Sequence, residues 1–289
     1  TLNPSSAASD VYKRQQTGFQ PAFVMIKKTN ANDDWFMFDD KRSPTNSRQK
    51  YILANSSNAE ADYGNPFLNI YANGFQPVTT SGAINSGDYI YLAFAADGST
   101  ATPSLANSFA TEIYTGNGGT QAITGTGFKP DFSWVKNRNT AGNSHLLADS
   151  IRGVNNVLYS NLTNAQYFNS TYQFNSFNAD GITVTDDTNG NYGINGNGET
   201  YVSWNWKAGG TPSINTDGTI TSVVSANQAA GFSVISWTGN STTGATIGHG
   251  LNAAPELFIT KNLGATNLQW ATYNVTTGNG ARLTLNESA

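Results

Sequence analysis

The stretch "TGFQPAFVMIKK" at residues 17–28 decides how this sequence folds, because a second version, "TGFKPDFSWVKN", stands at residues 126–137. A looser third version, "HGLNAAPELFITKN", occupies residues 249–262. Each version joins a turn to a run that is mostly apolar. In the first version the apolar run is unbroken, which is typical of a central strand covered on both faces. The sequence therefore predicts one β unit that is present three times.

Further short motifs surround each version and keep the same order. The middle copy is the fullest, with strand-like runs or turns at 109–117, 132–136, 145–149, 157–161, 180–185 and 201–207. The first copy has matching runs at 23–27, 35–39, 51–55, 73–74 and 89–94, and its opening run is missing. The third copy has runs at 232–240, 257–261 and 270–274 and lacks a second half. The order suggests a window from a longer array of repeats.

The strand phase supports this alignment. Val202, Trp204 and Trp206 alternate with polar neighbours, so they share one face of a pleated strand. The first copy places Ile90, Leu92 and Phe94 at the matching positions. No run has the apolar spacing of a long helix, and turn signals such as Asn73-Gly74 and Asp180-Gly181 separate the short strands. We therefore expect an all-β fold of tandem, antiparallel β-sandwich or jelly-roll repeats.

The repeat boundaries predict five parts. These are a non-native or disordered leader (1–15), a first module without its opening strand (16–97), a complete second module (108–210), a linker with a docking strand (211–231) and a truncated third module (232–289). Residues 10–15, "DVYKRQ", resemble the translation of a sequencing adapter. The alternatives for the leader are a basic linker or a remnant of processing.

Composition excludes several classes of function. The net charge of −4 argues against a nucleic-acid partner, which requires a basic face. No run of 18 apolar residues predicts a membrane span. The absence of cysteine excludes disulfides, zinc fingers and thiol chemistry.

The set of motifs resembles tail-fibre-like virion proteins of tailed bacteriophages, especially marine ones. The motifs that carry the resemblance are "GFQPAFVMIKK", "WFMFDDKRSP", "LANSSNAEA", "GDYIYLAFA", "TGFKPDFSWVKN", "YVSWNWKAGG" and "TITSVVSANQAAGFSV". The resemblance implies tandem β-sandwich modules of the concanavalin-like lectin type, location in the virion, contact with other virion proteins, and a trimer. It implies no catalytic residues and no cofactor.

No catalytic constellation is found. The two histidines have no fixed nucleophile nearby in sequence, and no Gly-x-Ser-x-Gly motif occurs. His145 aligns with Trp35, which favours packing over catalysis. Polar and aromatic residues that recur at aligned positions are the candidates for ligand binding: Trp35, Asp39, Arg42, Asn55, His145, Asp149, Arg152 and Asn161.

Each of these candidates also has a structural interpretation. An aspartate three residues before an arginine can form an ion pair that caps a tight turn, and we favour that interpretation for Asp39 and Asp149. The third copy has Asn274 there, which a turn tolerates and an acid catalyst does not. Residues 186–199 combine acidic and glycine residues, but they lack the regular spacing of a calcium loop, so a plain turn and no metal is the expectation.

The resulting hypothesis is a non-enzymatic virion structural protein, a tail fibre or appendage segment that contacts host-surface glycans. One alternative is a carbohydrate-binding module of a secreted bacterial adhesin, which would be extracellular. A polysaccharide-degrading tailspike is the third, and it would require two carboxylates facing one cleft.

Overall fold

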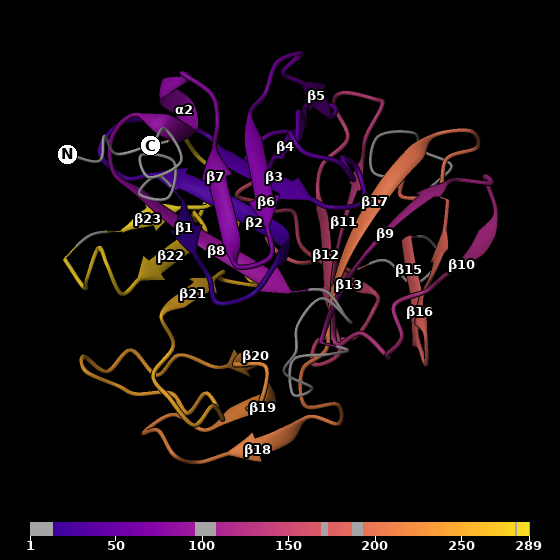
Figure 1. The fold of residues 1–289 in the computed structure, drawn as a ribbon. Helices are drawn as coiled ribbons and strands as arrows, with labels where there is room; N and C mark the ends of the chain where they lie inside the picture. Colours follow the sequence, from indigo (N-terminus) through magenta and orange to yellow (C-terminus); the bar gives the residue numbers. More distant parts are fainter. Residues whose placement is uncertain (1–13, 96–107, 169–172, 187–192, 281, 289) are drawn as a thin grey trace, which may run out of the picture.

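The computed structural model describes residues 14–95, 108–168, 173–186, 193–280 and 282–288. All named strand pairs are antiparallel, and the described residues contain one short helix, α2 (Gly82–Asn85). The prediction of an all-β, sandwich-type fold is confirmed. Figure 1 shows the fold, and we describe it as a first segment (14–95), a middle segment (108–210) and a third segment (211–288).

The first segment forms two facing sheets. Its strands are β1 (Gln15–Gln16), β2 (Pro21–Lys28), β3 (Trp35–Asp39), β4 (Lys50–Leu53), β5 (Ala61–Asp62), β6 (Leu68–Tyr71), β7 (Gly74–Pro77) and β8 (Tyr89–Ala95). The sheet β5-β4-β3-β2-β8 packs on the sheet β1-β7-β6 through a core that includes Val24, Ile26 and Phe75. Gln15, the last residue of the expected leader, pairs in β1, while residues 1–13 lie outside the described part.

The middle segment has the same two-layer plan. Its strands are β9 (Phe109–Thr115), β10 (Thr120–Thr124), β11 (Phe132–Asn137), β12 (Leu146–Asp149), β13 (Asn156–Val157), β14 (Tyr167–Phe168), β15 (Gln173–Asn178), β16 (Gly181–Thr185) and β17 (Thr200–Trp206). The sheet β12-β11-β17-β9 packs on β10-β16-β15 through Val135, Val184 and Tyr201, and β13 pairs with β14.

The third segment has six strands: β18 (Ser213–Asn215), β19 (Ser222–Asn227), β20 (Phe232–Trp237), β21 (Leu257–Thr260), β22 (Ala271–Asn274) and β23 (Leu283–Thr284). They form the sheets β18-β19-β20 and β21-β22-β23. The strand expected in the linker at 211–231 is β19, which pairs with β20.

Two tight hairpins depend on glycine at aligned positions. Tyr71 pairs with Gly74, and Asn178 pairs with Gly181, so each hairpin has a two-residue loop. Gly74 has φ +153° and Gly181 has φ +129°. A Cβ atom would lie 1.9 Å from the carbonyl oxygen of Gln15 at the first site and 2.0 Å from that of Ile123 at the second. The neighbouring strand therefore approaches these hairpins more closely than any residue with a side chain permits.

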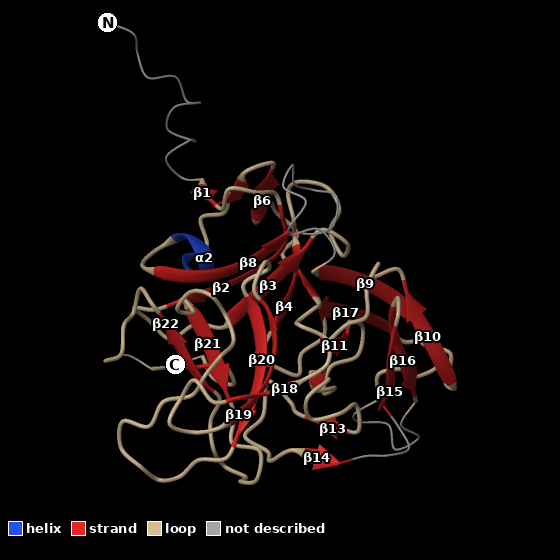
Figure 2. Cartoon of the chain, turned by 90° about the horizontal axis from the view of Figure 1, so that it is seen from below, coloured by secondary structure: helices blue, strands red, loops and turns tan. Residues whose placement is uncertain are grey.

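A shared hydrophobic core joins the three segments, and Figure 2 shows their strands meeting around it. Its members include Phe23, Met25, Trp35 and Met37 from the first segment, Phe109, Trp134, Leu147, Trp204 and Trp206 from the middle one, and Trp270, Leu283 and Leu285 from the third. The sheets β5-β4-β3-β2-β8 and β12-β11-β17-β9 therefore each have one face on their own sandwich core and the other face on the shared core. This explains why β2 is apolar at consecutive positions. Tandem modules can each have a separate core, but here one core contains residues of all three segments.

Candidate functional site

The recurring asparagines make the same hydrogen bond in every segment, to the backbone of a residue 16 to 20 positions earlier. The side-chain oxygen of Asn55 accepts a hydrogen bond from the backbone N–H of Trp35 at 3.0 Å. Asn161 does the same for His145 at 3.1 Å, and Asn286 for Trp270 at 2.8 Å. These amides bond the backbone rather than a ligand, as short polar side chains in turns commonly do.

The three aromatic rings at those positions connect the segments in a circle. Trp35 Nε1 of the first segment donates to the carbonyl oxygen of Thr284 in the third at 3.0 Å. Trp270 Nε1 of the third segment donates to the carbonyl oxygen of Tyr159 in the middle one at 2.9 Å. His145 Nε2 of the middle segment lies 3.0 Å from the carbonyl oxygen of Leu53 in the first, which closes the circle. We call these three contacts the aromatic ring contacts.

The recurring lysines repeat that circle in the same direction. Lys27 Nζ donates to the carbonyl oxygen of Ser288 at 2.8 Å, and Lys261 Nζ to that of Thr163 at 3.1 Å. Lys136 Nζ donates to the carbonyl oxygen of Ser57 at 3.4 Å. Burial lowers the pKa of Lys136 to about 8, since the charged form loses its hydration there. Lys27 and Lys136 are buried, although a lysine at the end of a strand is usually solvated.

His145 is a neutral side chain with both ring nitrogens engaged. Trp134 Nε1 donates to its Nδ1 at 2.8 Å, so the ring proton lies on Nε2 and is donated to Leu53. The side chain is fully buried, and burial is the main cause that moves its pKa well below the usual value, with the positive charge of Lys136 acting in the same direction. A group held in this form cannot take up a proton as a general base at neutral pH.

The two Asp–Arg pairs cap turns. Asp39 Oδ1 accepts the backbone N–H of Arg42 at 2.8 Å, and Oδ2 accepts Arg42 Nε at 2.5 Å. Asp149 and Arg152 show the same two contacts at the same distances. Asn274 accepts the N–H of Thr276 at 2.9 Å, so the turn in the third segment forms without the ion pair. The favoured interpretation of these pairs as structural agrees with this geometry.

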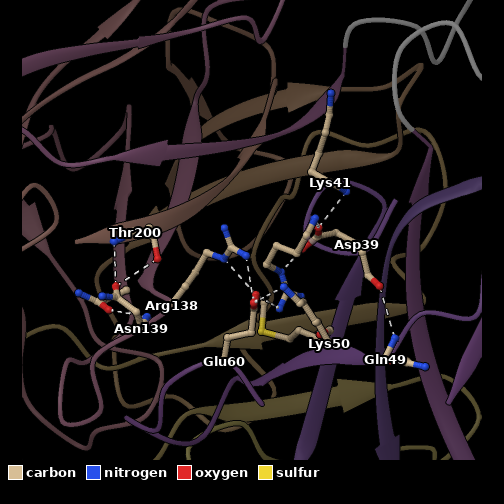
Figure 3. A network of polar contacts seen from close by, with 12 residues as sticks. Asp39, Lys41, Gln49, Lys50, Glu60, Arg138, Asn139 and Thr200 are labelled. Carbon is tan, nitrogen blue, oxygen red and sulfur yellow. Dashed lines mark hydrogen bonds and ion pairs between the residues drawn. The ribbon is translucent and has the colours of Figure 1, made fainter. Parts of the chain in front are cut away.

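Glu60 joins the first and middle segments through charges (Figure 3). It accepts from Arg42 Nη1 at 3.2 Å and from Arg138 Nη2 at 2.9 Å, and Lys50 lies 3.7 Å away. Neither Glu60 nor Arg138 was among the residues predicted from the sequence. Their spacing carries no motif, and only the packing of one segment on another brings them together.

The eight predicted site residues are therefore structural in their observed contacts. The side chains of Trp35, Asp39, Arg42, His145 and Asp149 are buried, and Asn55, Arg152 and Asn161 are half-buried. A hollow of about 170 Å³ is lined mainly by Phe94, Phe109, Trp206 and Phe232, and none of its lining residues is titratable. The hollow therefore contains no pair of carboxylates of the kind that glycoside hydrolysis uses.

Metal binding finds no support in the described ranges. Within them no group of three histidine, cysteine, aspartate or glutamate residues could hold a metal ion. Of the turn at 186–199, residues 187–192 lie outside the described part of the chain. Among the described residues, no helix has both the length and the apolar character that crossing a membrane requires.

Comparison with protein families gives one match, described as a domain of unknown function, DUF7483, over residues 6–97 and 104–289. No curated protein and no solved structure matches the chain. The family match spans nearly the whole chain, so all three segments fall within it.

Proposed function

We propose that this chain, which belongs to the DUF7483 family, is a non-enzymatic structural component of a phage virion, in a tail fibre or related appendage. The observation that carries the proposal is that its recurring polar residues bond one segment to the next. Catalytic side chains would instead point into an open cleft and have hydrogen-bond donors or acceptors available for a substrate. A rigid body that holds its loops in fixed positions is what an appendage requires.

The resemblance of the motifs to tail-fibre-like proteins supplies the biological setting of this proposal. The low content of charged residues, 12%, and the extensive strand pairing fit a rigid, folded body. Trimer formation with other copies, and contact with other virion proteins, belong to the proposal on that resemblance. A location in the virion is likewise part of it.

Contact with host glycans is the second part of the proposal, and it would use exposed residues other than the eight predicted ones. Tyr167 is 50% exposed and Phe168 is 63% exposed, and aromatic side chains of this kind can stack on sugar rings. Glycan-array binding that is lost in Tyr167→Ala or Phe168→Ala would support this part. Alanine at Trp35 or Asp149 would be a poor probe, because both side chains hold the fold.

Proteomics of purified phage particles tests the virion assignment. Cleavage after Arg138 and Arg152 releases the peptide of residues 139–152, which is suitable for mass spectrometry. We expect it in tailed particles banded on a density gradient from marine samples, at a constant ratio to capsid peptides. Its recovery only in the secreted bacterial fraction would refute the virion role and favour the adhesin.

A further inference from the structure

We call the interface between two segments a joint, and the three joints differ in one titratable group. In the third–first and middle–third joints the aromatic side chain is a tryptophan, Trp35 or Trp270. In the first–middle joint His145 takes that position and contacts the backbone of Leu53. Histidine is the side chain whose ordinary pKa lies between pH 5 and pH 8. The first–middle joint is therefore the one whose aromatic contact can change its charge in mild acid.

The hydrogen bonds of His145 leave no place for a second ring proton. Trp134 Nε1 donates to Nδ1 at 2.8 Å, so a proton on Nδ1 would meet another N–H group. The second nitrogen, Nε2, already donates to the carbonyl oxygen of Leu53. A charged imidazole donates from both nitrogens. The ring must therefore leave Trp134 before it takes up a proton.

The charged groups that act on the ring oppose protonation in the closed joint. They are Lys136 of β11 and Arg42 of the turn after β3, and both are positive. Arg42 is paired with Asp39 and Glu60, whereas Lys136 donates to backbone carbonyl oxygens. A protonated ring would thus add a second buried positive charge beside Lys136, and separation of the two segments would relieve it.

Backbone hydrogen bonds cross each joint and report on it separately. In the first–middle joint the N–H of Glu60 donates across the interface at 2.8 Å and that of Gly142 at 3.0 Å. In the middle–third joint the N–H of Gln166 does so at 2.8 Å, and in the third–first joint that of Asp33 at 2.7 Å. Each of these amides exchanges its hydrogen with water only when its bond opens.

We propose that mild acid opens the first–middle joint while the other two joints stay closed. In the open form the His145 ring leaves Trp134 and Leu53 and takes up a proton from the solvent. Acid therefore stabilises the open form relative to the closed form, which has no place for that proton. The shared core would become accessible between the first and middle segments.

The share of open molecules should rise with acidity by a defined factor. In the open form the solvated ring has its ordinary pKa of about 6.5. Below that pH the ratio of open to closed molecules should grow by up to about tenfold per pH unit. Above about pH 7 the ring is neutral in both forms, so the ratio should not depend on this group.

Amide hydrogen exchange of the full chain between pH 7.5 and pH 5 tests the proposal. Each rate is divided by the rate of an unstructured amide at the same pH, which gives a protection factor. We expect the protection factors of Glu60 and Gly142 to fall by up to about tenfold per pH unit below pH 6.5. Those of Gln166 and Asp33 should stay constant.

Two variants separate the charge of the ring from its packing. His145→Trp together with Trp134→Met copies the aligned pair of the first segment, Trp35 and Met25, which lies in the same shared core. His145→Gln keeps a donor and an acceptor on a side chain that does not titrate. In both variants the pH dependence of protection across the first–middle joint should disappear.

Three results would overturn the proposal. Protection factors that fall together at all four amides would show unfolding of the whole chain instead of the opening of one joint. Constant protection at Glu60 and Gly142 would show that the joint does not respond to acid. The same pH dependence in His145→Gln as in the wild-type chain would assign the response to another group.

Discussion

His145 should make the stability of this protein fall below neutral pH. In the native state its ring is neutral, with Nδ1 accepting from Trp134 and Nε2 donating to Leu53. A second ring proton would point at the Trp134 N–H, in a buried place near Lys136. In the unfolded chain the ring titrates normally, at a pKa of about 6.5. Because the native pKa is well below that, the unfolded state binds more protons as the pH falls through about 6.5.

The magnitude follows from proton linkage. One proton taken up only by the unfolded state costs about 1.4 kcal/mol per pH unit. This slope applies below about pH 6.5, where the unfolded ring is charged while the native ring is neutral. His145→Gln is the matched variant, because glutamine offers both a donor and an acceptor and does not titrate.

Urea unfolding at pH 7.5, 6.5, 5.5 and 4.5 measures this effect. We expect the stability of the wild-type chain to fall more steeply below about pH 6.5 than that of His145→Gln, by up to about 1.4 kcal/mol per pH unit. The other acidic groups are common to both proteins and cancel in the comparison. Parallel pH profiles for the two proteins would refute the argument. NMR of the two histidine rings gives a direct check, since the His145 resonance should not titrate while the chain is folded.

Three further predictions concern the other buried contacts. Lys136 has a native pKa of about 8, so between pH 8 and about 10.5 its side chain binds fewer protons in the folded than in the unfolded state. The free energy of unfolding should therefore rise by roughly 3 kcal/mol across that window. Urea unfolding of Lys136→Met should show no such rise, and Lys207→Met is the control. Asp39→Ala should cost about 3 kcal/mol, because it removes the buried carboxylate that accepts from Arg42 Nε and leaves Glu60 as the remaining ion-pair partner of Arg42. The Asp39→Ala/Arg42→Met double variant should cost less by the same assay. Equal losses would contradict the ion-pair reasoning. Glu60→Ala should cost about 2 kcal/mol by removing charged hydrogen bonds between two segments, a loss that thermal unfolding should detect against exposed Glu256→Ala.

Alternation and turn chemistry made the strands predictable from the sequence. The inward face of Val202, Trp204 and Trp206 and the hairpins at Gly74 and Gly181 follow from period-two patterns and local backbone needs. Local rules also favoured the turn interpretation of Asp39 and Asp149, which the contacts support.

The contacts between segments were not predictable in the same way. Trp35 and Thr284 are 249 positions apart, and nothing near either residue specifies the other. The buried state of Lys136 likewise depends on a surface from another segment, so its strand position alone suggested solvent. Glu60 was missed because a single carboxylate in a loop is ordinary until Arg42 and Arg138 meet it.

The aromatic ring contacts have a consequence for how longer chains of this kind could be built. Each segment donates one of these hydrogen bonds to a neighbour and accepts one from the other neighbour, so the three bonds form a closed circle. Each of the three acceptor carbonyl groups is used once. A fourth segment could therefore not join the circle through the same contacts. Any further segment of a longer chain would therefore need contacts of another kind to attach to these three.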